Sequence, residues 1–219
     1  GRDRRFFERT SLDSKITVPF CPESVLSGIC STDYLNCVWY LKRVKIKKCN
    51  KRVILHFGAV DYESYLYING KEAYHNIGGY VGFDVDITSY VKRGEENIIT
   101  VCAIDTHPNN KASGKQCENY YSIECCYTRT TGIWQTVWLE YVEKNRIEYV
   151  KYYPSAEQKN VQMEISVKGN ENLSVLCSYE EKVQGSVDIS LKNGVNYVTV
   201  PLNEIYLWEA GNGRLYDVE

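Results

Sequence analysis

Short runs of β-branched and aromatic residues, each closed by turn residues, recur through the first 142 residues of the chain. Runs of this kind are typical of β-strands, and few stretches show the period of a helix. Within SYLYINGKEAYH (64–75), Asn69-Gly70 is a strong signal for a two-residue type I′ hairpin turn. The other segments predicted to be strands are KITVPF (15–20), NCVWYLKRVKI (36–46), RVILHFGAV (52–60), YVGFDVDI (80–87), IITVCAID (98–105), YSIECCY (121–127) and IWQTVWLEYV (133–142). This order favours an all-β fold, a sandwich or jelly roll, over a parallel α/β sheet.

A second set of strand-like runs follows the charged segment VEKNRIEYV (142–150). Breaks typical of hairpins separate these runs, at Gly169-Asn170, Gly185 and Asn193-Gly194. We therefore expect a jelly-roll domain over residues 1–142 and a smaller immunoglobulin-like β-sandwich over residues 146–219. Because immunoglobulin-like domains usually contain about 100 residues, we expect the second domain to be incomplete at its C-terminal end.

Charge and hydropathy narrow the classes of partner. The chain has a net charge of −2 at pH 7 and a pI near 6.0, without a basic run or stripe. This balance gives little support to nucleic-acid binding. No apolar run approaches the roughly 20 residues that cross a membrane, so no membrane partner is expected.

The nine cysteines, an odd number, are scattered without a CxxC pair. Most lie inside apolar strand-like runs, as Cys37 and Cys102 do, and adjacent Cys125 and Cys126 have poor geometry for a disulfide. Buried, reduced thiols of a cytoplasmic protein explain this pattern best, and the first residues do not match a signal peptide. The cysteine spacings do not match a zinc site, so we expect neither a metal nor another cofactor.

The segment around Gly132 carries two tryptophans four residues apart. In an uninterrupted strand, Trp134, Thr136 and Trp138 share one face, because side chains alternate with a period of two. Two tryptophans on one face predict a core position or a contact between domains. On this interpretation Trp138→Ala lowers stability by roughly 3–5 kcal/mol, as truncation of a buried tryptophan does.

Five motifs in order resemble one enzyme family. They are VPFCPES (18–24), VWYLKRV (38–44), HFGAVDYESYLYINGKEAYHNIGGYVGFDVDIT (56–88), TGIWQTVWLE (131–140) and LWEAGNGRLYDVE (207–219), in which Gly213 stands where the family usually has proline. On these motifs the chain resembles the N-terminal part of glycoside hydrolase family 2, which contains β-galactosidases, β-glucuronidases and β-mannosidases.

The resemblance implies a jelly-roll sugar-binding domain, an immunoglobulin-like domain and then a (β/α)₈ barrel that holds both catalytic glutamates of a retaining mechanism. It implies that the whole protein is a β-galactosidase-like or β-glucuronidase-like hydrolase of O-glycosidic bonds. Its expected partners are a small-molecule or oligosaccharide β-glycoside, its own barrel and further copies of itself. These 219 residues contain no barrel pattern, so we expect no catalytic residue in them and no activity from them alone. The first jelly-roll strand of the family also has no match here. Two alternatives stay open, a stand-alone carbohydrate-binding module and a purely structural pair of β-sandwiches.

The resemblance also suggests substrate-facing residues in the loop before Gly132. Family members often have a sugar-binding aspartate six residues before that glycine, where this chain has Cys126; Glu124 lies close enough to substitute. Arg129 matches an arginine of the galactosidases, and Asp105 ends the strand that enters the same loop. Carboxylates and guanidinium groups suit sugar hydroxyls, which both donate and accept hydrogen bonds. An ordinary solvated loop with a salt bridge is the alternative. Structural roles are favoured for His75 and for His107-Pro108.

Overall fold

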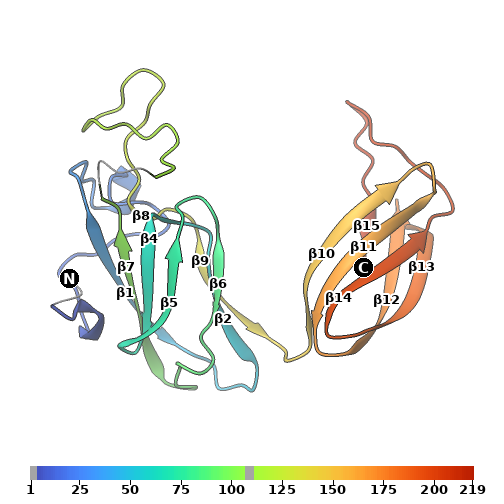
Figure 1. Cartoon of the computed structure of the whole chain (residues 1–219), viewed down its shortest axis with the longest axis horizontal. Helices are drawn as coiled ribbons and strands as arrows, with labels where there is room; N and C mark the ends of the chain where they lie inside the picture. The colour runs from blue at the N-terminus through green and yellow to red at the C-terminus, as the bar shows by residue number, and fades with distance from the viewer. Residues whose placement is uncertain (1–3, 107–110) are drawn as a thin grey trace. The chain divides into compact units, whose positions relative to one another are not determined.

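The computed structural model describes residues 4–106 and 111–219. The chain divides into two compact units, Gly1–Val142 and Glu143–Glu219, and each unit is an antiparallel β-sandwich (Figure 1). The predicted all-β class is therefore confirmed. No helix among the described residues is long and apolar enough to span a membrane.

The first unit is built from two main sheets and a short strand pair. One sheet has the order β1-β7-β4-β5, the other has the order β6-β2-β9, and β3 pairs with β8. The strands are β1 (Cys37–Lys45), β2 (Arg52–Phe57), β3 (Val60–Asp61), β4 (Glu63–Ile68), β5 (Lys71–Ile77), β6 (Phe83–Asp86), β7 (Glu96–Ile104), β8 (Gly132–Ile133) and β9 (Val137–Val142). Two short 3₁₀ turns, η1 (Phe6–Glu8) and η2 (Val25–Ser27), precede them.

Alternation along β2 shows how the sequence divides the sandwich into an inside and an outside. Val53, Leu55 and Phe57 are buried in the core, whereas Arg52 and His56 lie on the opposite face. The core between the sheets continues through residues of the other strands, including Tyr40, Leu66, Val85, Val101 and Ile133. Burial of these apolar side chains is the main force that holds the two sheets together.

The hairpin predicted at Asn69-Gly70 is confirmed. Its two residues join β4 to β5 and have φ angles of 51° and 80°, the positive values that a type I′ turn needs. The Asn69 side chain adds to the turn, because its Oδ1 accepts a hydrogen bond of 3.0 Å from the Ile98 N–H.

Two segments predicted to be strands are not strands. Residues 18–20 of KITVPF form a turn, and Pro19 lacks the N–H that a central strand needs. In YSIECCY, only isolated bridges form: the N–H groups of Ile123 and Cys126 bond to each other's carbonyls around a tight turn. Most of these side chains are exposed, so the segment has no core face to support a strand.

The two tryptophans do not share a strand, which corrects the prediction for them. The chain leaves β8 after Ile133, which lies opposite Val60 of β3, and it enters β9 at Val137, which pairs with β2. Trp134 lies in the break and donates from its indole nitrogen to the Gly79 carbonyl over 2.8 Å. Trp138 lies on the outer face of β9 and is 47% exposed, so it is not a core residue.

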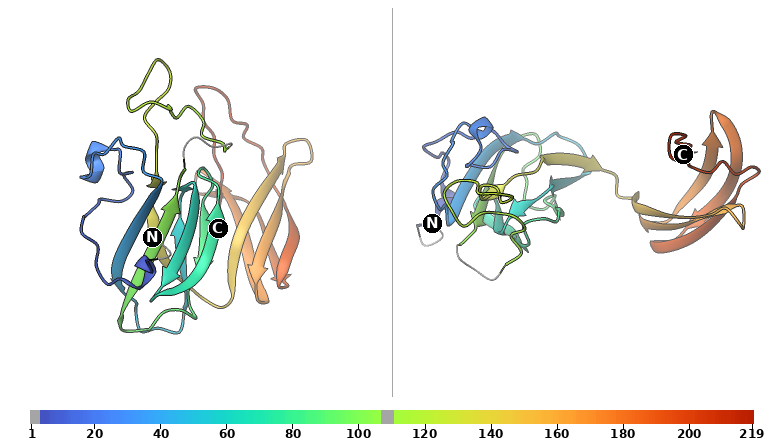
Figure 2. Two further views of the ribbon diagram at one scale, coloured as in Figure 1. Left: turned by 60° about the vertical axis from the view of Figure 1, so that its left-hand side comes forward. Right: turned by 90° about the horizontal axis from the view of Figure 1, so that it is seen from above.

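The second unit contains two three-stranded sheets, with the orders β10-β11-β14 and β13-β12-β15 (Figure 2). Its strands are β10 (Arg146–Ser155), β11 (Asn160–Lys168), β12 (Glu171–Tyr179), β13 (Lys182–Leu191), β14 (Gly194–Pro201) and β15 (Asp217–Val218). Met163, Ile165 and Val200 lie at the centre of a separate apolar core.

The break predicted at Gly185 is wrong. Gly185 lies within β13, and the β12–β13 turn is formed by Glu180 and Glu181, with φ angles of 47° and 63°. Gly185 is needed there for a different reason: a Cβ at this position would lie 2.0 Å from the carbonyl oxygen of Pro201. The glycine therefore permits close approach of two backbones inside the sandwich.

Candidate functional site

The long loop, residues 105–131, connects β7 to β8, and its described part from residue 111 onward rises above the ends of these strands (Figure 1). Its first anchor is Asp105, which is 1% exposed. The Asp105 N–H donates to the Asn36 carbonyl over 3.0 Å, and its carboxylate pairs with the ammonium of Lys111, which is also buried. Burial lowers the pKa of Lys111, and the charge of Asp61 opposes that shift. The loop thus begins with a buried ion pair.

Gln116 provides a second anchor. Its Nε2 donates to Oδ2 of Asp61 over 2.7 Å and to the Tyr80 hydroxyl over 3.1 Å. Its Oε1 accepts from the Thr130 N–H over 2.8 Å. Asp61 belongs to β3 and is 1% exposed. One amide side chain therefore ties both arms of the loop to the sandwich.

Arg129 provides the third anchor and is itself 1% exposed. Its guanidinium lies 4.0 Å from the centre of the Tyr34 ring. Its N–H groups donate to the carbonyls of Thr32 and Asn119, and more weakly to that of Cys117 over 3.5 Å. The planar, five-donor guanidinium is suited to this role, because it satisfies several carbonyls from different segments at once.

The loop ends at a closely packed junction. Gly132 has a φ of 76°, and a Cβ there would lie 2.3 Å from the Tyr40 hydroxyl. That hydroxyl accepts from the Ile133 N–H over 3.2 Å, and burial raises the pKa of Tyr40. Glu23, which is also buried, accepts from the Thr131 N–H over 3.2 Å. The glycine that the sequence motif singled out is therefore required by both its backbone angle and its neighbour.

The tip of the loop differs from its anchored base. Glu124 is exposed and has a φ of 52°, at the turn between Ile123 and Cys126. Cys126 is partly buried; desolvation and the neighbouring Cys125 raise the pKa of its thiol, so it stays protonated at neutral pH. The tip also exposes three aromatic side chains, those of Tyr120, Tyr121 and Tyr127.

The four residues predicted to face a substrate thus divide into two pairs. Asp105 and Arg129 lie inside the protein at the two ends of the loop, where their side chains contact protein groups. Glu124 and Cys126 lie together at the tip. His75 lies outside this loop, on β5, where Nε2 is 2.8 Å from Oε1 of Glu63 and its ring stacks on Tyr65. His107 and Pro108 lie outside the described residues.

Three anchoring residues were missed by the sequence analysis: Asp61, Lys111 and Gln116. Only Asp61 carried a signal, since it is the one acidic residue at the end of a run of buried apolar residues in RVILHFGAVD. Lys111 and Gln116 lie in a polar stretch, where nothing distinguishes a buried side chain from a solvated one.

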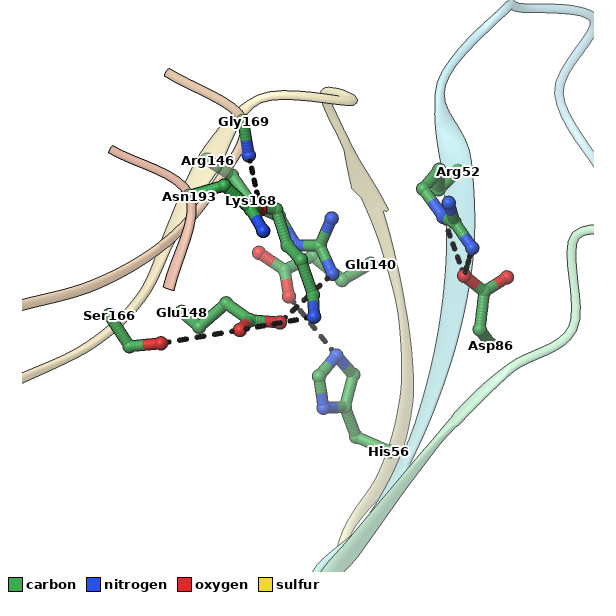
Figure 3. Close-up of polar contacts among 10 residues, drawn as sticks. All are labelled: Arg52, His56, Asp86, Glu140, Arg146, Glu148, Ser166, Lys168, Gly169 and Asn193. Atoms are coloured by element: carbon green, nitrogen blue, oxygen red, sulfur yellow. Dashed lines mark hydrogen bonds and ion pairs between the residues drawn. The ribbon is translucent and has the colours of Figure 1, made fainter. Parts of the chain in front are cut away.

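Two further polar groups lie on outer sheet faces (Figure 3). In the first unit, Nδ1 of His56 is 2.6 Å from Asp84 and Nε2 is 3.1 Å from Glu140, while Arg52 pairs with Asp86. In the second unit, Glu148 contacts a basic and polar group composed of Arg146, Ser166 and Lys168. Among the described residues, no group of three or more His, Cys, Asp or Glu side chains is arranged to hold a metal ion.

Comparison with known proteins shows similarity to glycoside hydrolases. The model of glycosyl hydrolases family 2, sugar binding domain, matches residues 24–142. A putative β-glucuronidase of Formosa agariphila is 27% identical over 188 residues, which are 83% of this chain and 21% of that protein. A β-galactosidase of Thermoanaerobacter pseudethanolicus is 31% identical over 140 residues, 62% of this chain and 18% of that protein.

Solved structures show the same fold at lower identity. The Faecalibacterium prausnitzii β-glucuronidase superposes with a TM-score of 0.72 at 22% identity, over 97% of this chain and 40% of that one. A Ruminococcus gnavus β-glucuronidase gives 0.70 at 17% identity, over 100% of this chain and 38% of that one. The chain therefore spans about a fifth of the length of these curated relatives and about two fifths of that of the solved structures. Because the family model covers more than half of the chain, the protein belongs to glycosyl hydrolase family 2.

Proposed function

We propose that this chain is the non-catalytic N-terminal region of a retaining β-glycosidase, and that its long loop faces the substrate of a catalytic barrel in the same protein. The relatives that support this proposal are named β-glucuronidase or β-galactosidase. In a retaining mechanism two carboxylates of the barrel act as acid/base and nucleophile. The second β-sandwich, with an immunoglobulin-like arrangement, supports the barrel. The whole enzyme works as a homo-oligomer in the cytoplasm, a reducing compartment in which cysteines stay as thiols.

The proposal that the loop faces the substrate is supported by the contrast between its two parts. The base contains the anchoring residues Asp105, Lys111, Gln116 and Arg129, whereas the tip, residues 120–127, is mostly exposed. Three polar side chains attach the base to the sandwich: those of Lys111 and Arg129, which are buried, and that of Gln116, which is partly buried. Burying charged groups is costly unless they are paired. A loop that only connects two strands does not need buried charged side chains. Such anchors hold a binding loop in one position, which lowers the entropy lost when a ligand binds.

Within the proposed site, Glu124 and Cys126 contact the sugar, whereas Asp105 and Arg129 position the loop. The carboxylate of Glu124 has no anchoring role at the base and accepts hydrogen bonds from sugar hydroxyls. The thiol of Cys126 supplies a weak donor next to it.

The experiment is hydrolysis of nitrophenyl β-D-glucuronide and β-D-galactoside by the full-length protein that contains this chain, with the 219-residue chain assayed alongside. We expect turnover of one of these glycosides by the longer protein and none by the chain alone. Turnover by the chain alone would overturn the assignment of catalysis to a barrel. Absence of hydrolysis, together with sugar binding by the chain in calorimetry, would favour the stand-alone carbohydrate-binding module.

The role of the loop is tested separately in the same full-length protein. Glu124→Ala is expected to lower kcat/KM by roughly 10- to 100-fold, because a hydrogen bond to a charged group contributes about 1.5–3 kcal/mol. Glu118→Ala is the matched control, since Glu118 is an exposed acid of the same loop. If both variants keep the kcat/KM of the unmodified enzyme, the loop does not touch the substrate and the two sandwiches serve as a scaffold only.

A further inference from the structure

Two cysteines of the first unit lie side by side on neighbouring strands. Cys37 begins β1 and Cys102 lies in β7, and these strands pair antiparallel with Trp39 opposite Cys102. Because Cys37 and Trp39 are on the same face of β1, the two cysteines are diagonal neighbours on one face of the sheet. Their Sγ atoms are 3.6 Å apart. Tyr40, next to Trp39, faces the core, so the cysteine pair is on the outer face.

The two thiols have different surroundings. Cys37 is exposed, whereas Cys102 is 0% exposed. A hydrogen bond from Cys102 lowers the pKa of Cys37 to about 7. At neutral pH a substantial share of Cys37 is therefore the thiolate, the form that reacts with disulfides. One sulfur is reachable and nucleophilic, and the second is protected and within contact distance of the first.

The other cysteines with a shifted pKa lack this combination. Hydrogen bonds from Asn119 lower the pKa of Cys117 too, but Cys117 is buried. Cys125 and Cys126 are adjacent in sequence, and the pKa of Cys126 is raised rather than lowered. Cys177 is buried in the second unit, and burial raises its pKa as well. The pair in β1 and β7 therefore stands out by geometry and by exposure.

We propose that Cys37 and Cys102 form a thiol–disulfide switch that a low-molecular-weight disulfide oxidises. The Cys37 thiolate attacks one sulfur of the reagent RSSR; that S–S bond breaks, and one RS⁻ leaves. The Cys102 thiol then loses its proton and attacks the Cys37 sulfur of the mixed disulfide, which expels the second RS⁻. The protein loses two hydrogen atoms and gains one S–S bond, while RSSR is reduced to two RSH.

The position of the pair connects the switch to the long loop. Asn36, the residue before Cys37, accepts the hydrogen bond from the Asp105 N–H, three residues after Cys102. A Cys37–Cys102 disulfide would cross-link β1 to β7 directly beneath the residue that starts the loop. Oxidation would thus fix the spacing of the two strands from which the loop begins.

The test uses the 219-residue chain incubated at neutral pH with mixtures of oxidised and reduced glutathione, followed by rapid alkylation and mass spectrometry. We expect a fraction of the protein that has lost two hydrogen masses, with the Cys37 and Cys102 peptides linked in a digest made without reductant. Cys102→Ser should instead accumulate one glutathione on Cys37, and Cys37→Ser should leave Cys102 unmodified. Cys125→Ser, the control, should leave the cross-link unchanged.

Two results would overturn the proposal. One is stable glutathionylation of Cys37 in the unmodified chain without a cross-link, which would show that Cys102 does not resolve the mixed disulfide. The other is a cross-link that disappears in Cys125→Ser, which would place the reactive thiol in the long loop. The pH dependence of Cys37 alkylation gives an independent readout, with a midpoint expected at about 7.

Discussion

The imidazole of His56 lies flat against the indole of Trp138, with ring centroids 4.7 Å apart and planes 5° from parallel. The two residues are directly opposite on β2 and β9. Asp84 and Glu140 hold the two ring nitrogens of His56 in place on either side (Figure 3 shows Glu140). The stacked pair therefore covers part of the outer face of this sheet with an ordered aromatic surface, while the Trp138 ring stays about half exposed.

Trp138→Ala should consequently be milder than truncation of a core tryptophan. We expect a loss of about 0.5–1.5 kcal/mol, the range for a cross-strand aromatic pair. Urea unfolding measures this from the shift of the midpoint at constant slope. Trp138→Phe is the control and should recover most of the stability, because a phenyl ring still stacks on His56. A loss above 3 kcal/mol for the alanine variant would restore the interpretation that the ring is a core residue.

Gly132→Ala should be strongly destabilising, because of the left-handed backbone at this position and because of a clash with Tyr40. Comparison with Gly28→Ala separates the two effects. Gly28 has a φ of 82°, similar to the 76° of Gly132, but no atom lies within 4 Å of a Cβ placed there. Gly28→Ala should therefore show only the cost of the left-handed backbone, about 1–2 kcal/mol. Gly132→Ala should add about 1–3 kcal/mol for the clash with the Tyr40 ring. Equal losses in the two variants, measured by denaturant unfolding, would show that Tyr40 moves aside freely.

Asp86 gives the first unit a defined dependence on pH. Burial opposes its charge, but hydrogen bonds from Thr88 and from the Arg52 guanidinium outweigh burial and lower the pKa of Asp86 (Figure 3). A carboxyl whose pKa is lower in the folded state stabilises the fold above its unfolded pKa and loses that contribution as pH falls. The unfolded value for aspartate is about 3.9.

The measurement compares the unmodified chain with Asp86→Asn across pH. The unmodified chain should be more stable by about 1 kcal/mol or less near neutral pH, as is usual for a partly exposed pair. This advantage should be constant down to about pH 5 and then decrease as the pH falls below about 4. A difference that persists unchanged into the most acidic folded conditions would contradict the role of the charge.

Much of the fold could be read from local patterns, and the failures have physical causes. The alternation in RVILHFGAV and the Asn69-Gly70 turn identify elements whose own residues determine them. KITVPF and YSIECCY have strand-like composition, yet neither forms a strand. Ile16 of the first segment packs against the core, but the chain turns at residues 18–20, and the second segment is mostly exposed. Gly185 looked like a break because its close neighbour, the Pro201 carbonyl, lies on another strand.

The candidate site likewise contains residues that the local sequence identifies and residues whose role depends on the tertiary fold. Gly132 and the acidic residue at the end of β7 could be recognised, because both depend on where a strand begins or ends. The partner of Asp105 could not be deduced, since Lys111 resembles any solvated lysine until the loop folds back. Gln116 joins Asp61 across 55 positions of sequence, and contacts of this kind come from the tertiary fold rather than from the local pattern.

The ion pair between Asp105 and Lys111 should protect the long loop from cleavage by trypsin. The Lys111 side chain is 4% exposed, so trypsin cannot reach it while the loop is anchored. Asp105→Asn removes the negative charge and leaves a buried ammonium, a loss that typically costs about 3–5 kcal/mol. Local opening of the loop is less costly than holding that charge inside, so Lys111 should become exposed and cleavable.

Limited trypsin digestion with mass spectrometry of the fragments provides the measurement. Cleavage after Lys111 should be much faster in Asp105→Asn than in the unmodified chain, while the second β-sandwich stays intact. Lys115 is exposed in the same loop and serves as an internal control, because its cleavage should be present in both proteins. If Asp105→Asn gains no cleavage after Lys111, then the nearby charge of Asp61 is sufficient to hold the lysine, and the anchor depends on β3 rather than on the end of β7.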